Sequence, residues 1–106
     1  MTYISTIFYN HKNGFDRTAV GLIFFDDNSQ YIDISEDKLK RLKDIRGYKL
    51  FRMTLDNFIK AKHTKEELDR MSIYFNGIFQ ITKPSKILIE CNEEVFRKLF
   101  TKYVEI

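Results

Sequence analysis

VGLIFFDDNSQYIDIS, residues 20–35, predicts two β-strands joined by a polar turn. The first half is apolar at successive positions, which is typical of a central strand buried on both faces. The second half alternates, with Ile32 and Ile34 on one side and Tyr31 and Asp33 on the other. This alternation predicts a half-buried strand beside the first. The DDNS tetrapeptide between them is rich in the residues that favour turns.

The residues before this stretch extend the same pattern. Thr2–Asn10 is rich in Tyr, Ile, Thr and Phe, which suit a pleated surface. Asn13-Gly14 is a turn dipeptide, and Thr18–Phe25 then forms the central strand. Gly21 inside that strand indicates a bulge or a close approach of another backbone. The first third of the chain is therefore predicted to be an antiparallel meander.

A basic amphipathic helix is predicted to follow. Ser35 is a good N-cap, and the acidic residues after it favour the positive end of a helix dipole. Leu39, Leu42 and Ile45 recur at three-residue steps, and the helix is expected to end near Gly47.

Helical segments and short strands fill the rest of the chain. Tyr48–Met53 is interpreted as a short strand or an irregular crossing, and Thr54 as the cap of a second helix. Thr64 begins a capping box, which predicts the start of a third helix. Ile78–Thr82 is expected to be extended because a proline follows shortly after it, and Ile87–Cys91 is predicted to be a strand. Asn92 then caps a last helix whose apolar stripe consists of Val95, Phe96, Leu99, Phe100 and Tyr103.

These elements predict an α+β fold in two layers: an antiparallel sheet of about four to five strands with three to four helices packed on one face. The 106 residues contain only four glycines and one proline, and no linker divides them. Residues 1–106 are therefore expected to form a single domain. No apolar run reaches the roughly 18 residues that span a bilayer, and Met1–Asn10 lacks the features of a secretion signal. We expect a soluble cytoplasmic protein.

Charge is distributed unevenly around the basic helix. Residues 26–37 hold five acids and no base, whereas residues 38–49 hold six bases and one acid. A solvated helix with ends that complement its dipole explains this pattern, and so does a docking patch for an acidic partner. A nucleic-acid-binding helix is a third interpretation, although the adjoining acids would oppose phosphate contacts.

Groups that carry chemistry are sparse. His11 and His63 have no further ligand at metal-binding spacing, so both are expected to be solvated and exposed. Cys91, the single cysteine, is expected to be a buried small hydrophobic residue without a base to activate it. No phosphate-binding glycine loop occurs. The sequence predicts no catalytic residue, metal site or cofactor.

One acidic pattern offers an enzymatic alternative. Asp33, Glu36 and Lys38 follow the D…E-x-K order of metal-dependent nucleases, in which carboxylates hold the metal and the lysine positions water. Here the E-x-K falls at a predicted helix start instead of along a strand, and the order arises easily by chance in a charged sequence.

The order of motifs resembles a known family. The VGLIFFDDNSQYIDIS block, a later FQITKPSKILIE block (Phe79–Glu90) and the EEVFRKLFTKYV helix (Glu93–Val104) together resemble the bacterial domain-of-unknown-function 3037 family. Ala19 departs from the family, which more often has a polar residue there. The resemblance carries over no catalytic residue. It implies a genetic context beside HipA-like kinases, which belong to toxin–antitoxin systems, and residues 20–34 are also similar to a small N-terminal subdomain of those kinases.

The function expected from these observations is a small protein-interaction or regulatory module. Its partner would be a HipA-like kinase or another defence component, and a homodimer formed by strand-edge pairing is a further option. Nucleic-acid binding through the basic helix and a phage-type inhibitor role are the alternatives. The expected contact surfaces are the strand edge and hairpin near Tyr9 and the basic helix, with partner-binding residues His11, Lys12, Arg17, Lys40, Arg41, Lys43 and Arg46.

Overall fold

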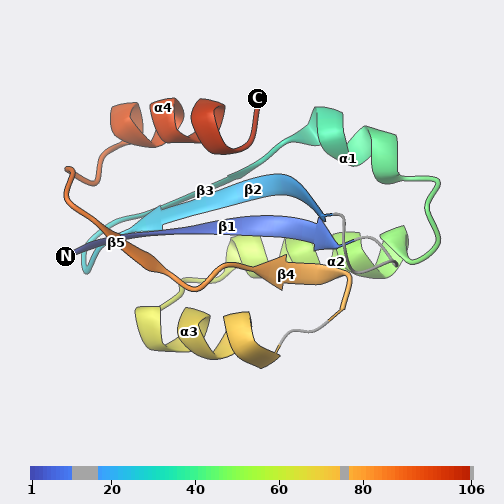
Figure 1. The fold of residues 1–106 in the computed structure, drawn as a ribbon, viewed down its shortest axis with the longest axis horizontal. Coiled ribbons are helices and arrows are strands. Elements are labelled where there is room, and N and C mark those ends of the chain that lie inside the picture. The colour runs from blue at the N-terminus through green and yellow to red at the C-terminus, as the bar shows by residue number, and fades with distance from the viewer. Residues whose placement is uncertain (11–16, 75–76, 106) are drawn as a thin grey trace.

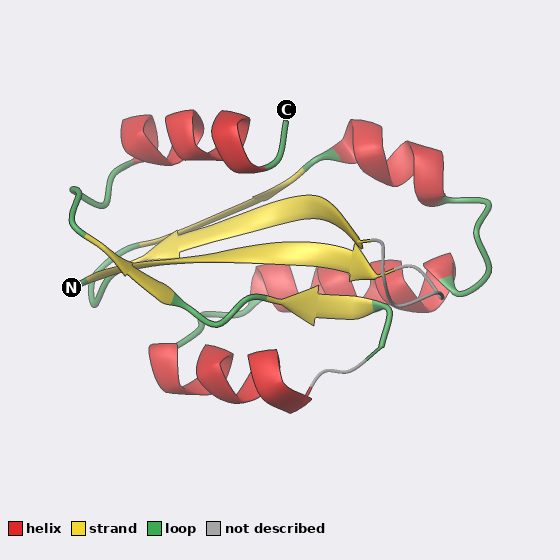
Figure 2. Ribbon diagram, viewed as in Figure 1, coloured by secondary structure: helices red, strands yellow, loops and turns green. Residues whose placement is uncertain are grey.

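The structure is a computed structural model that describes residues 1–10, 17–74 and 77–105. Within these residues, five strands form one antiparallel sheet and four helices pack around it (Figures 1 and 2). No helix in the described residues is long and apolar enough to cross a membrane. The strands are β1 (Thr2–Asn10), β2 (Arg17–Phe25), β3 (Gln30–Ile34), β4 (Phe79–Ile81) and β5 (Ser85–Ile87). The helices are α1 (Glu36–Leu42), α2 (Tyr48–Lys60), α3 (Lys65–Tyr74) and α4 (Glu93–Tyr103).

The predicted meander is confirmed, and it forms the centre of the sheet. The strand order is β3-β2-β1-β4, and β5 pairs with β1 next to β4. β4 pairs with Ile7–Tyr9 and β5 with Thr2–Ile4, so β1 has neighbours along both edges. Tyr9 lies between Thr18 of β2 and Phe79 of β4 and is 2% exposed. The prediction of a free strand edge near Tyr9 is therefore wrong.

Gly21 marks both of the features that its place in the strand predicts. Ile7 pairs with Gly21 whereas Phe8 pairs with Ala19, so Val20 is an extra residue in β2 and forms a bulge. A Cβ atom at Gly21 would also lie 3.0 Å from the carbonyl oxygen of Asp33. The close approach of β3 thus requires the absence of a side chain.

Both faces of the sheet carry a hydrophobic cluster, which corrects the expectation that all helices pack on one face. Figure 1 shows α4 along one face and α2 and α3 on the other side. The clusters agree with this arrangement, because β2 is apolar on both faces and needs cover on each. The first cluster joins the sheet to α1, α2 and α3 through residues that include Ile7, Ile23, Leu39, Phe51, Leu55, Phe58 and Leu68. The second joins it to α4 through Ile4, Leu22, Phe24, Phe96, Phe100 and Val104.

Three predicted helix caps are confirmed by hydrogen bonds. The Ser35 hydroxyl accepts from the Lys38 amide at 3.3 Å, and the Thr64 hydroxyl accepts from the Glu67 amide at 3.2 Å. The Asn92 side chain accepts from the amide three residues later at 2.9 Å. Each bond satisfies one of the amides that a helix start leaves without a partner.

The segment around Gly47 differs from the prediction. α1 ends at Leu42, so it is shorter than expected, and Gly47 is the N-cap of α2, with φ of +91°. Tyr48–Met53 is helical, and Thr54 lies inside that helix, where its hydroxyl donates to the Leu50 carbonyl. Gly47 adopts the left-handed conformation that other residues rarely take, which allows the chain to turn sharply from one helix into the next.

The last strand also differs. β5 ends at Ile87, so the predicted strand over Ile87–Cys91 is confirmed only at its first residue. β5 pairs with β1 up to Thr2, the first residue of β1, and the chain bends at Ile89. Among the described strands, none pairs with Leu88. The predicted turn at Asn13-Gly14 lies outside the described residues, together with His11 and Lys12.

Candidate functional site

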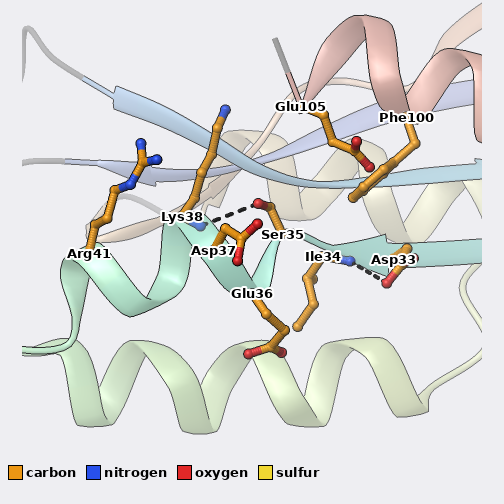
Figure 3. A pocket seen from close by; sticks show the side chains of 9 residues that line it. All are labelled: Asp33, Ile34, Ser35, Glu36, Asp37, Lys38, Arg41, Phe100 and Glu105. Atoms are coloured by element: carbon orange, nitrogen blue, oxygen red, sulfur yellow. Dashed lines mark hydrogen bonds between the residues drawn. The ribbon is translucent and has the colours of Figure 1, made fainter.

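The acidic residues of the nuclease-like pattern line an open hollow of about 540 Å³ between the start of α1 and the end of α4. The side chains of this pattern point in different directions in Figure 3: Glu36 points toward α2, and Lys38 points to the opposite side. The position of each follows from its own partners. The lining residues are Asp33, Ile34, Ser35, Glu36, Asp37, Lys38, Arg41, Phe100 and Glu105.

Two of the carboxylates in this hollow form ion pairs with arginines from other helices. Arg97 of α4 donates to Asp33 at 2.6 Å, and Arg52 of α2 donates to Glu36 at 2.9 and 3.2 Å. The hydrogen bond that Arg97 donates to Asp33 also raises the pKa of Arg97. These ion pairs connect β3 to α4 and α1 to α2, so both carboxylates already have an arginine partner within the fold.

Lys38 also has a hydrogen-bond partner. Its ammonium donates to the carbonyl oxygen of Ala19 at 3.0 Å, beside the bulge in β2. Burial, with the neighbouring charge of Arg41, lowers the pKa of Lys38. Asp33, Glu36 and Lys38 thus do not converge on one point, and the described residues contain no group of three or more His, Cys, Asp and Glu that could hold a metal ion. The geometry gives no support to the nuclease interpretation.

His63 is buried, which corrects the expectation of a solvated side chain. Its ring is stacked on Phe58 at 4.1 Å between centroids. Nε2 donates to the Phe58 carbonyl at 2.7 Å, and Nδ1 lies 2.8 Å from the Glu67 carboxylate. The backbone amide of His63 also donates to Gln30 of β3. The residue therefore anchors the α2–α3 connection to the edge of the sheet.

Cys91 is half-buried against the second cluster, close to the small hydrophobic role expected for it. Burial and, to a smaller extent, the charge of Asp26 raise the pKa of its thiol to about 11. Little thiolate is present at neutral pH, so the side chain is a poor nucleophile.

The strongest candidate for a functional surface is the corner where α1 leads into α2. Its cations are exposed, and none of them forms a salt bridge with the described residues. Asp44 is the one acid among them. We call this surface the cationic corner; it comprises the cations Lys40, Arg41, Lys43, Arg46 and Lys49 and the apolar residues Ile45, Leu50 and Met53.

Large apolar side chains are exposed within the cationic corner. Leu50 is 65% exposed and Met53 is 55% exposed, and they lie one turn apart on the side of α2 that faces away from Phe51 and Leu55. Ile45, which was expected on the buried face of the basic helix, is exposed in the turn before α2. A helix that needed only to be solvated would carry polar residues at these positions.

The structure places several predicted partner-binding residues at one end of the molecule. The start of β2, the end of β1 and the α1–α2 connection lie together at the end opposite the N-terminus (Figure 1). A Cβ at Gly47 would lie 2.7 Å from Ile78, whose carbonyl accepts from the Asn10 amide, which confirms that these segments are adjacent. Arg17 is exposed here, with its guanidinium 4.1 Å from the centre of the Phe8 ring.

The acidic block of residues 26–37 is not a single surface next to these cations. Asp26 and Asp27 belong to the β2–β3 turn, which lies at the opposite end of the molecule (Figure 1). Asp33 and Glu36 are held by arginines, as described above. Asp37, the fifth acid of the block, is exposed in the first turn of α1. The opposition that the sequence predicts between this block and phosphate contacts therefore comes from fewer acids near the cationic corner than the sequence suggests.

Comparison with known proteins gives no match, whether with family models, with curated proteins or with solved structures. The resemblance to the 3037 family stays a prediction from sequence motifs. The fold alone defines the class of this chain: an α+β domain with a five-stranded antiparallel sheet and four helices among the described residues.

Proposed function

We propose that this chain is a protein-interaction or regulatory module that binds an acidic partner protein through the cationic corner. The observation that carries the proposal is the exposure of Leu50 and Met53 among five cations that form no salt bridge with the described residues. Interfaces combine an apolar centre with a polar rim, and the cationic corner has both parts. The resemblance at the level of sequence makes a HipA-like kinase, or another toxin–antitoxin or defence component, the first partner to test.

Nucleic acid is the alternative ligand for the cations of this surface. A phosphate backbone requires positive charge but gains little from an exposed leucine or methionine. Single strands do stack on aromatic side chains, but Phe51 is buried and Leu50 and Met53 are aliphatic. The apolar residues of the corner therefore favour a protein partner. A phage-type inhibitor would use the same surface and differ only in the identity of its target.

Reversing the charge of three cations should weaken partner binding. We expect the variant Lys40→Glu/Arg41→Glu/Lys43→Glu to bind at least about tenfold more weakly, because charges that steer association would repel an acidic surface. The measurement is the amount of partner that the immobilised protein retains from native lysate, followed by a titration with the purified partner. Lys60→Glu, an exposed lysine at the far end of α2, is the matched control and should bind like the unaltered chain.

Labelled 20-nucleotide single strands and duplexes, titrated at two salt concentrations, test the alternative. Tight binding that falls steeply with salt and is lost in the triple variant would replace the proposal with nucleic-acid binding. Unchanged protein binding by the triple variant would reject the cationic corner.

A further inference from the structure

The segment Lys86–Glu90 (KILIE) leaves β-forming residues exposed and without a strand partner. Leu88 is 89% exposed, the largest exposed fraction among the apolar side chains of the described residues, and Ile89 is exposed beside it. With Met1, Thr2 and the rest of the segment they line an open hollow of about 480 Å³. In the part of the chain that the structure describes, the backbone of residues 88–90 forms no hydrogen bond.

The outer edge of β5 is open. β1 pairs with β2 along one edge and with β4 and β5 along the other, so no described strand lies on the far side of β5. The opposite edge of the sheet, β3, is less available, because the Ile34 amide already donates to the Asp33 side chain at 2.8 Å. Pro84, which has no amide hydrogen, limits pairing to the part of the chain after it.

The charges of this segment are self-complementary. If two copies pair antiparallel about Leu88, then Lys86 lies opposite Glu90 of the other copy, and the same pair forms again on the other side of the axis. Ile87 lies opposite Ile89, and the two Leu88 side chains meet at the centre. Neither Lys86 nor Glu90 forms a salt bridge within the described residues. Opposite charges directly across an antiparallel pair stabilise it.

We propose that a second copy of this chain pairs with the open edge of β5, antiparallel and centred on Leu88, to form a two-fold symmetric dimer. The second copy pairs along the outer edge of β5, so residues 88–90 straighten from the bend at Ile89 into the strand that their sequence predicts. Ile87 already packs on the second cluster, and the paired strands extend that apolar surface across the axis. The interface is self-complementary, as a two-fold axis requires.

Charge-swap variants test this arrangement by sedimentation equilibrium. The unaltered chain should pass from monomer to dimer with increasing concentration, between about 10 µM and 1 mM, because a strand edge is a small interface. Lys86→Glu and Glu90→Lys should each raise the dissociation constant about tenfold or more, since each places like charges opposite one another twice. The double variant Lys86→Glu/Glu90→Lys should regain most of the lost affinity.

Mixing the two single variants gives the sharpest result. One copy then carries two acids and the other two bases, so an antiparallel heterodimer should form although neither variant dimerises well alone. Leu88→Asp should abolish association, and Lys60→Glu should leave it unchanged.

A chain that stays monomeric throughout this range would overturn the proposal. So would single variants that dimerise as well as the unaltered chain, or a mixture that fails to associate. The β5 edge and the cationic corner lie at opposite ends of the molecule (Figure 1). Loss of dimerisation and loss of partner binding are therefore separate results.

Discussion

Replacing Phe51 with alanine is expected to lower the free energy of unfolding by about 3–5 kcal/mol. Phe51 is 2% exposed and lies where α2 meets the sheet. Its ring contacts Tyr9 edge-on at 4.9 Å and Phe79 at 5.9 Å between centroids. The substitution would remove the transfer free energy of the ring and leave a cavity that β1 and β4 cannot fill without moving.

Urea denaturation followed by circular dichroism measures this loss. A domain of this size has a stability of about 5–15 kcal/mol, so the variant should unfold at a much lower urea concentration. Asn57→Ala, an exposed position on the same helix, should change stability by no more than about 0.5 kcal/mol. If Phe51→Ala costs less than about 1 kcal/mol, α2 does not pack on the sheet as described.

Removing the His63 side chain should have the second-largest effect on stability, a loss of about 2–4 kcal/mol. The side chain is 4% exposed, so its two hydrogen bonds are protected from water. His63→Ala leaves the Phe58 carbonyl without the strong donor at Nε2 and removes the ring that is stacked on Phe58. The α2–α3 connection would lose the side chain that links Phe58 of α2 to Glu67 of α3, while the His63 backbone amide keeps its donation to Gln30 of β3.

The variant Glu67→Gln separates the contribution of the Glu67 carboxylate from that of the buried His63 ring. The Glu67 side chain is 42% exposed, so water competes for its contact with His63 Nδ1 and the contact contributes only about 0–1 kcal/mol. We therefore expect Glu67→Gln to be much milder than His63→Ala in the same denaturation assay. Equal losses would show that the contact with Glu67, and not the buried ring, anchors the connection.

The meander and three helix starts are predictable from the sequence because their signals are local. Alternation in 30–34 and the side-chain oxygens of Ser35, Thr64 and Asn92 act within a few residues, and the structure confirms each of them. The apolar run of β2 also indicates that both faces of the sheet are covered. Helix periodicity alone could not show which face α4 would take, because that depends on the path of the chain after β5.

The prediction for Tyr48–Met53 is wrong because a glycine such as Gly47 can do more than end a helix. A glycine with positive φ also serves as the N-cap of the next helix, and Phe51, Leu55 and Phe58 recur at helical spacing after it. The same spacing leaves Leu50 and Met53 on the opposite, exposed face. Interpreting Tyr48–Met53 as a short strand or an irregular crossing thus hides the apolar half of the cationic corner. Four of the five cations, Lys40, Arg41, Lys43 and Arg46, are among the expected partner-binding residues.

His63 and the strand after Ile87 could not be predicted for a different reason. The burial of His63 depends on Gln30, which is 33 residues away, and on the packing of Phe58. β5 pairs with β1 only over Ser85–Ile87, and the extent of that pairing is a contact between segments more than 80 residues apart in the sequence. Both outcomes are set by tertiary contacts that no local pattern contains.

The measurement that tests the central claim most directly is partner binding by the variant Leu50→Ser/Met53→Ser. Both side chains are exposed, so the variant should fold as stably as the unaltered chain. The variant retains all the positive charge of the unaltered chain. If the cationic corner is a protein-binding surface, the variant should nevertheless bind the purified partner at least about tenfold more weakly. Undiminished binding to the partner, or a loss confined to the charge-reversed variant, would contradict the account.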